Sequence, residues 1–248
     1  MKKTIKIMLF MLSLLLCDVA MSQVEGVLPT PRKAEKRSGA FSILTTTQIT
    51  HYSQLRSSAL YLSEYLPLLV CNYNADVKGN IVLRVDEKLA DEGYILDISA
   101  DGITIDGGSA AGVHNGIETL LQLLPPQVYS SPLATPVEVP CCRIEDSPRY
   151  AYRGFMLDVC RTWLDKEAVM EYIDLLAYHK INSLRLHLTD DEAWRIEIKS
   201  HPELAEIGGF RGSNSPIWPR YGKWNERWGG YYTQDDMREI IEYARIRN

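Results

Sequence analysis

The sequence predicts two domains of different class: an α+β domain at the N-terminus, followed by the first two βα units of a parallel α/β domain. Before about residue 145, short strands, a hairpin and helices follow one another in mixed order, which is typical of α+β domains. From residue 149 on, the order is strand, helix, strand, helix, which indicates parallel strands. Two parallel strands with two helices cannot cover both faces of a sheet, so the second domain is expected to be incomplete.

In the first domain, hydrophobic periodicity and turn residues define the elements. Asp101-Gly102 separates two alternating runs and predicts a hairpin, and Pro125-Pro126 stops the last helix. The predicted elements are a polar, extended lead-in over 23–40, strands over 41–50 and 81–85, helices over 53–71 and 113–124, the hairpin over 94–105, and a loose connection over 127–140.

In the second domain, strands are predicted over residues 153–160 and 181–188. Asp165 can cap the helix between them, and Thr233 to Asp236 can start the next helix as a capping box. A long loop rich in Gly, Trp, Arg and Pro, from about residue 203 to 232, precedes the second of these helices. The residues expected to face the core are Val169, Met170, Ile173, Leu176 and Ala177 in the first helix, and Met237, Ile240, Ile241 and Ala244 in the second.

The net charge of −5 and the pI near 5.6 give no basic field for nucleic acid. An anionic ligand would be mildly repelled, so a neutral ligand suits this balance best. Four cysteines follow residue 22, two of them adjacent (Cys141 and Cys142), and none has a metal-like spacing with histidine. We therefore expect no metal and no cofactor, and either free buried thiols or a single disulfide whose pairing the sequence leaves open.

The N-terminus has the three parts of a secretory signal peptide. Three lysines precede an apolar run from Ile7 to Cys17, and the small residues Ala20 and Ser22 follow. We expect cleavage after Ser22, export across the inner membrane, and a periplasmic or cell-surface location. Cys17 keeps open the alternative of a lipid-modified cysteine. The apolar run is too short to span a bilayer, and no transmembrane segment is expected in the mature chain.

Four blocks of the second domain, in order, resemble glycoside hydrolase family 20, the β-N-acetylhexosaminidases. Their sequences are RYAYRGFMLDVCR (149–161), YIDLLAYHKIN (172–182), HLTDDEAWRIE (187–197) and GGYYTQDD (229–236). Upstream, DGITID (101–106) and GVHNGIETLLQLL (112–124) resemble the noncatalytic domain that precedes this barrel. The resemblance implies a signal peptide over 1–22, a noncatalytic α+β domain over 23–145, and the start of a (β/α)8 TIM barrel over 146–248.

The family resemblance also implies an activity: exo-hydrolysis of terminal N-acetylglucosamine or N-acetylgalactosamine from glycans. The mechanism is retaining and substrate-assisted, so the acetamido oxygen of the sugar attacks the anomeric carbon. A neighbouring Asp-Glu pair orients the acetamido group and supplies the general acid, and no residue of this chain matches that pair. We therefore expect the chain to be inactive alone. The sequence does not distinguish the two sugars or the linkage, and it does not give the oligomeric state.

Two residues match the sugar-binding side of the family pattern. Arg161 is expected to bind ring hydroxyls of the terminal sugar, because its rigid guanidinium can reach two neighbouring oxygens. Asp190 resembles the residue that supports a histidine beside the catalytic acid. Strand alternation instead groups Asp191 with His187, so Asp191 is the second choice, and His187 itself is expected to be a hydrogen-bonded core residue. Trp194 and Arg195 are expected to pack behind the site.

Two alternatives stay open. The loop tryptophans Trp218, Trp224 and Trp228 either stack on sugar rings or anchor the loop. The chain itself is either part of a hydrolase or a noncatalytic carbohydrate-binding or accessory fragment.

Overall fold

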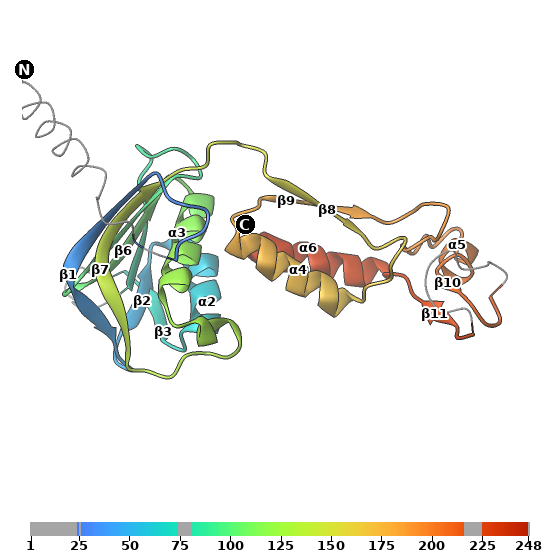
Figure 1. Ribbon diagram of the computed structural model, residues 1–248, viewed down its shortest axis with the longest axis horizontal. Helices are drawn as coiled ribbons and strands as arrows, with labels where there is room; N and C mark the ends of the chain where they lie inside the picture. Colours follow the sequence, from blue (N-terminus) through green and yellow to red (C-terminus); the bar gives the residue numbers. More distant parts are fainter. Residues whose placement is uncertain (1–23, 25, 74–80, 216–224, 248) are drawn as a thin grey trace, which may run out of the picture. The chain divides into compact units, whose positions relative to one another are not determined.

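A computed structural model describes residues 24, 26–73, 81–215 and 225–247. The chain forms two compact units, Met1–Pro148 and Arg149–Asn248, coloured from blue to red along the chain in Figure 1. The predicted signal peptide lies outside the described residues. Within those residues, no helix is long and apolar enough to cross a membrane. All four described cysteines are free thiols, three of them buried.

The first unit is built on one mixed seven-stranded sheet in the order β1-β7-β5-β6-β4-β2-β3. Strands β2, β3, β4 and β6 run parallel to one another, and β1, β7, β5 and β6 pair antiparallel. The strands are β1 (Lys33–Ile43), β2 (Gln48–His51), β3 (Leu69–Asn72), β4 (Ile81–Val85), β5 (Tyr94–Ser99), β6 (Gly102–Gly107) and β7 (Val137–Asp146).

Helices α2 (Arg56–Tyr65) and α3 (Ala110–Leu123) pack on one face of this sheet (Figure 1). Ser109 caps α3 by accepting a hydrogen bond from the Ala111 amide. The helix lies close to the sheet at Gly116, where a Cβ atom would come within 2.4 Å of the Ile105 side chain. Ile105 and its strand neighbours on this face are buried, so the core of the unit lies between α3 and the sheet.

The predicted hairpin, the 81–85 strand and the α3 helix are confirmed, but the 41–50 strand was misplaced and β7 was missed. The region 41–50 is not one strand: it contains the end of β1 and the start of β2. The polar lead-in already belongs to β1 from Lys33, and the loose connection already belongs to β7 from Val137. Both strands pair with each other, and their polar outward residues hid the alternating pattern.

The helix predicted over 53–71 is too long. A 3₁₀ turn (Ser53–Leu55) leads into α2, which ends at Tyr65, and Leu69 already belongs to β3. Leu66 has extended backbone angles (φ −119°, ψ 103°), as the residue before Pro67 must, because the proline ring disfavours helical angles there. A second 3₁₀ helix (Pro126–Tyr129) follows α3.

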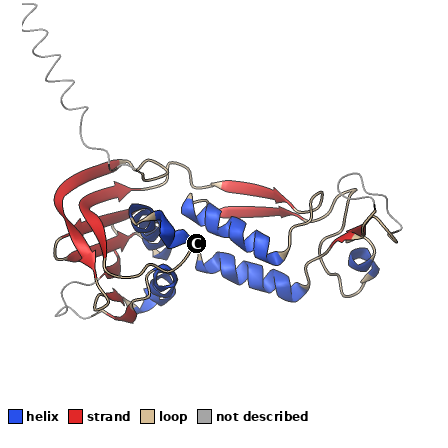
Figure 2. Ribbon diagram, turned by 60° about the horizontal axis from the view of Figure 1, so that its bottom comes forward, coloured by secondary structure: helices blue, strands red, loops and turns tan. Residues whose placement is uncertain are grey.

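The second unit contains two βα units. Strands β8 (Gly154–Asp158) and β9 (Ser183–His187) run parallel, and helices α4 (Lys166–Tyr178) and α6 (Gln234–Ile246) lie beside them in Figure 2. Short elements α5 (Glu203–Glu206), β10 (Phe210–Arg211) and β11 (Trp228–Gly229) occupy the long loop. The buried core consists of Leu157, Val159, Val169, Ile173, Tyr232 and Ile240.

Both predicted helix caps are present. Asp165 accepts a hydrogen bond from the Ala168 amide at 2.9 Å, and Thr233 and Asp236 form a reciprocal capping box. One core prediction is wrong: Ile241 is 61% exposed, because the helix turns its buried stripe toward Ile240. Helix α4 ends where Lys180 adopts the left-handed conformation (φ 57°).

Candidate active site

The candidate site lies where β8 and β9 end. In the parallel register, Asp158, the last residue of β8, stands opposite His187, the last residue of β9. The carboxyl ends of parallel strands lie at the same edge, which is where α/β barrels and open sheets bind their ligands. Each strand is followed by a tight turn that carries a charged residue, Arg161 after β8 and Asp190 after β9.

Asp158 shapes the turn after β8 and holds Arg161. Its Oδ1 accepts hydrogen bonds from the backbone amides of Cys160 (3.1 Å) and Arg161 (3.0 Å). Its Oδ2 accepts a hydrogen bond from Nη1 of Arg161 at 2.6 Å. One carboxylate therefore fixes both the backbone and the side chain of Arg161.

Asp190, rather than Asp191, lies against Arg161. Its Oδ2 is 2.6 Å from Nη2 of Arg161 and 2.7 Å from Nε2 of His187. Its Oδ1 accepts a hydrogen bond from the Asp191 amide at 2.7 Å. These contacts belong to Asp190, the first choice from the sequence; strand alternation, which groups Asp191 with His187, no longer applies because β9 ends at His187.

Electrostatics keep this cluster ionised. Hydrogen bonds from the Asp191 amide and from His187 hold the pKa of Asp190 well below its usual range. Burial opposes ionisation of Asp158, but hydrogen bonds from the Arg161 backbone and side chain outweigh it and lower its pKa. The Asp158 contact raises the pKa of Arg161. Two carboxylates and one guanidinium give the cluster a net charge of −1, which favours a neutral ligand over an anion.

Arg161 remains open to a ligand. Its side chain is 43% exposed, whereas those of Asp158 and Asp190 are 26% exposed. A guanidinium has five N–H donors, and the contacts with the two described carboxylates engage two of them. These contacts orient the remaining donors, whose planar arrangement suits hydrogen bonds to two neighbouring hydroxyl oxygens of a ligand.

Arg195 supports the turn from behind, where the sequence had placed it. It is fully buried and donates hydrogen bonds to the carbonyl oxygens of Val159 (3.1 Å), Cys160 (2.9 Å) and Gly230 (3.1 Å), and to that of Gly209. Its guanidinium lies over the ring of Trp163 at 5.5 Å. Burial lowers the pKa of Arg195 to about 10. Three backbone segments, at residues 159–160, 209 and 230, are thereby joined around one cation next to the turn that carries Arg161.

Of the loop tryptophans, Trp218 and Trp224 lie outside the described residues. Trp228 lies 5.9 Å from the Arg195 guanidinium, which supports its role as a loop anchor. Sequence reasoning missed Asp158, although a signal existed: an acidic residue ends the strand three positions before Arg161. Among the described residues, no group of three or more His, Cys, Asp or Glu side chains is arranged to hold a metal ion.

Two family comparisons cover almost the whole chain. Residues 25–147 match glycosyl hydrolase family 20, domain 2, and residues 150–248 match the catalytic domain of the same family. The boundary between the two matches coincides with the boundary between the two structural units.

Curated relatives are named as β-hexosaminidases. A β-hexosaminidase of Porphyromonas gingivalis is 35% identical over 96% of this chain and 32% of its own length. A β-hexosaminidase of Vibrio furnissii is 37% identical over 90% of this chain and 36% of its own length. The chain therefore spans about a third of the relatives that it matches.

Solved structures agree. The exo-β-N-acetylglucosaminidase of Vibrio harveyi, solved in complex with N-acetylglucosamine, has a TM-score of 0.82 and 36% identity over 92% of this chain and 35% of its own. The β-N-acetylhexosaminidase of Bacteroides fragilis has a TM-score of 0.75 and 27% identity over 89% of this chain and 43% of its own. The chain belongs to glycoside hydrolase family 20 and comprises domain 2 of that family followed by the N-terminal portion of its catalytic domain.

Proposed function

We propose that this sequence is part of a β-N-acetylhexosaminidase that removes terminal, non-reducing N-acetylglucosamine or N-acetylgalactosamine from glycans. The observation that supports it most is the Arg161 guanidinium, held by Asp158 and Asp190 with donors open toward a ligand. Relatives named as β-hexosaminidases and a relative solved with bound N-acetylglucosamine support the substrate class. The second unit would then be the first quarter of a (β/α)8 barrel, with this cluster on its catalytic face.

In this proposal the described residues bind and orient the sugar. Arg161 donates hydrogen bonds to ring hydroxyls of the terminal sugar. Asp190, already paired with Arg161 and His187, keeps a negative charge near the position where the family places its general acid. The nucleophile is the acetamido oxygen of the substrate, so the protein needs no covalent nucleophile. The Asp-Glu pair that orients the acetamido group and protonates the leaving oxygen has no match in this chain.

The test uses a longer protein that carries the rest of the catalytic domain. Arg161→Ala should lower kcat/KM for an aryl N-acetylglucosaminide by about two orders of magnitude, because each hydrogen bond from a charged donor contributes roughly 1.5–3 kcal/mol. Arg245→Ala is the matched control, since Arg245 is exposed and pairs with Glu242 on α6. A folded Arg161→Ala protein with the kcat/KM of the control would remove Arg161 from the site.

We also propose export of the protein across the inner membrane, on the strength of the basic and apolar N-terminus. Processing should occur between Ser22 and Gln23. Mass spectrometry of protein recovered from the cell envelope measures the new N-terminus directly. An acylated Cys17 as the first residue would establish the lipoprotein alternative, and an intact Met1 would refute export by this signal.

A further inference from the structure

A row of side chains crosses the first unit from one edge of the sheet to the other. The register places Arg84 opposite Asp106, Asp106 opposite Ile95, and Ile95 opposite Glu145. Lys33 stands opposite Glu145 on the edge strand β1. On the other side, His51 is paired with both Leu83 and Asn72, so the next residues, Tyr52, Arg84 and Tyr73, continue the same row. We call this set of seven residues the transverse row; in order across the sheet it consists of Tyr73, Tyr52, Arg84, Asp106, Ile95, Glu145 and Lys33.

The transverse row lies on the face of the sheet opposite to α2 and α3. Leu83 and Ile105 are buried, and Ile105 meets Gly116 of α3, so the residues that follow them point to the other face. Among the described residues of the first unit, Figure 1 shows no helix on that face. Tyr52 is 41% exposed and Tyr73 is 38% exposed. The row is therefore accessible, and seven strands give it a length of about 29 Å.

One end of the row is aromatic. The rings of Tyr52 and Tyr73 stack with their centroids 4.9 Å apart and their planes at 15°. The Tyr73 amide donates a hydrogen bond to the His51 carbonyl oxygen at 3.0 Å, which extends the ladder and fixes the position of the ring. Stacked, anchored rings present a flat apolar face at little entropic cost, and such a face packs against the C–H face of a pyranose ring.

The middle of the row is polar and electrically balanced. Arg84 donates two parallel hydrogen bonds to Asp106, from Nε at 2.6 Å and from Nη2 at 2.8 Å. Glu145 accepts a hydrogen bond from Nε of Arg143 at 2.9 Å and lies 3.6 Å from Nζ of Lys33. Arg143 also pairs with Asp97 of β5 at 2.8 Å. The row itself holds two basic and two acidic side chains, so its net charge is zero. Such pairs offer hydrogen-bond donors and acceptors to hydroxyl groups without attracting an ion.

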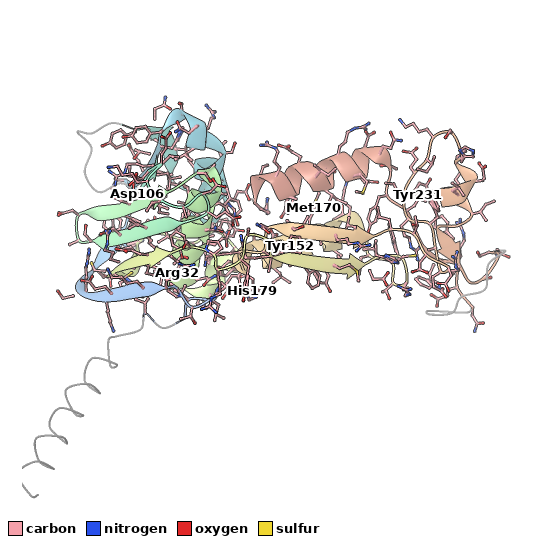
Figure 3. All side chains as sticks on the ribbon, turned by 90° about the horizontal axis from the view of Figure 1, so that it is seen from above. Arg32, Asp106, Tyr152, Met170, His179 and Tyr231 are labelled. Carbon is pink, nitrogen blue, oxygen red and sulfur yellow. The ribbon has the colours of Figure 1, made fainter. Side chains whose placement is uncertain are left out.

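The other end of the row opens into a hollow of about 230 Å³. Its lining includes Ile95, Glu145 and Lys33 of the row, together with Arg32, Asp146 and Ser147. Figure 3 labels Asp106, in the middle of the row, and Arg32, at the hollow. The lining is again charge-balanced, with two basic and two acidic side chains. The lining also includes the apolar side chains of Leu89, Ala90 and Ile95, so the hollow suits a neutral ligand that presents both C–H surface and hydroxyl groups.

We propose that the transverse row is a second glycan-binding site, separate from the Arg161 cluster, which binds a neutral oligosaccharide. The ligand class rests on the proposed function. A nucleic acid would require a net positive surface, and a protein partner would require a larger apolar centre than Ile95 provides. The ligand is longer than one sugar, because the aromatic end and the hollow lie at opposite edges of the sheet. The noncatalytic unit would then bind the glycan from which the proposed active site removes terminal sugars.

The experiment measures binding of the β-1,4-linked hexamer of N-acetylglucosamine to the full chain by isothermal titration calorimetry. Tyr52→Ala and Tyr73→Ala should each weaken the affinity about tenfold, since each removes one face of the aromatic pair. Tyr52→Phe keeps the ring and should retain the affinity. Arg84→Lys keeps the charge but loses the two-pronged contact with Asp106, and should weaken binding about threefold.

Two controls separate this site from the proposed active site. Arg245→Ala and Tyr150→Ala should bind the hexamer as the wild type does, because both residues are exposed in the second unit and belong neither to the row nor to the Arg161 cluster. Arg161→Ala removes the contact of the hexamer with the proposed active site and should retain the binding event that Tyr52→Ala and Tyr73→Ala weaken. Circular dichroism confirms that each variant is folded. Binding lost only in Arg161→Ala, binding unchanged in both tyrosine-to-alanine variants, or no binding would each overturn the proposal. Tighter binding of a sulfated than of the neutral hexamer would overturn the ligand class. A loss of hydrolysis in the longer protein would leave these results unchanged.

Discussion

The two units use their sheets in opposite ways. In the first unit, seven strands bury an apolar face under α2 and α3 and expose a charge-balanced face. In the second unit, strand β8 exposes apolar side chains, with Phe155 39% and Met156 53% exposed, and the residues of the candidate site follow the ends of β8 and β9. The helices of the first unit cover the apolar face of its sheet. In the second unit, two strands and two helices leave part of the apolar surface of the sheet uncovered, so the candidate site stands on a sheet that needs further elements to cover it.

The largest expected difference between the units is their resistance to proteolysis. Three or more strands with a covered apolar face are stable independently, whereas a two-stranded sheet is marginal. Limited proteolysis of the chain should therefore leave a resistant fragment that contains the first unit. The fragment should end between residues 147 and 153, because β7 lies between β1 and β5, and a cut within 127–140 would remove it from the sheet.

A fragment that ends before Val137, or a second unit as resistant as the first, would contradict this comparison. The same preparation should show no hydrolysis of a chromogenic N-acetylglucosaminide, since general acid catalysis alone commonly contributes 10²–10⁴-fold and no general acid matches this chain. Robust hydrolysis by the chain alone would contradict the proposal that these residues bind the sugar while the general acid is supplied by residues that have no match in this chain.

The sequence predicted the local features of both units and missed the non-local ones. The caps at Asp165 and Thr233 were predictable because a cap needs only residues within one helical turn. The β1–β7 pairing joins Lys33 to Glu145, more than a hundred residues apart, and no local pattern indicates it. At the candidate site, the family blocks indicated Arg161 and Asp190, which the structure places in contact, and their roles stay predictions. The contact of Asp158 with Arg161 becomes visible only in the structure, where the turn brings the carboxylate back to the guanidinium.

The next prediction concerns Asp190 in a longer, active protein. Asp190→Asn should leave KM nearly unchanged and lower kcat by about tenfold or more, because it removes a charge rather than a hydrogen-bonding group. Asp191→Asn is the matched control and should behave as the wild type. If the two phenotypes are exchanged, Asp191 has the role assigned here to Asp190.

The pH dependence of the second unit follows from the same carboxylates. The pKa values of Asp190 and Asp158 are lowered in the folded state, so their contribution to stability is present above the ordinary carboxyl range and is lost as the pH falls through the folded pKa values. The second unit should therefore lose stability below about pH 4. All five tryptophans lie at position 163 or beyond, so tryptophan fluorescence reports this unit alone. In Asp190→Asn, the loss of stability of the second unit between neutral pH and about pH 4 should be smaller than in the wild type, because one of the two titrating carboxylates is absent.

The smallest expected effect lies in the first unit, in a buried polar contact between α2 and α3. Tyr61, 1% exposed, donates a hydrogen bond of 2.5 Å to Oε1 of Glu118, which is also 1% exposed and lies 3.3 Å from Nε2 of His114. Tyr61→Phe keeps the ring but removes this donor, which should lower the free energy of unfolding by about 1–3 kcal/mol and the melting temperature by roughly 4 °C per kcal/mol.

Tyr52→Phe removes a hydroxyl from an exposed ring and is the control. The shift should appear in the far-ultraviolet circular dichroism melting of the first unit and leave the tryptophan fluorescence transition in place, because the contact lies wholly within residues 61–118. Equal melting of the two variants would show that the contact does not stabilise the unit, and a parallel shift of the tryptophan transition would show that the two units do not unfold independently.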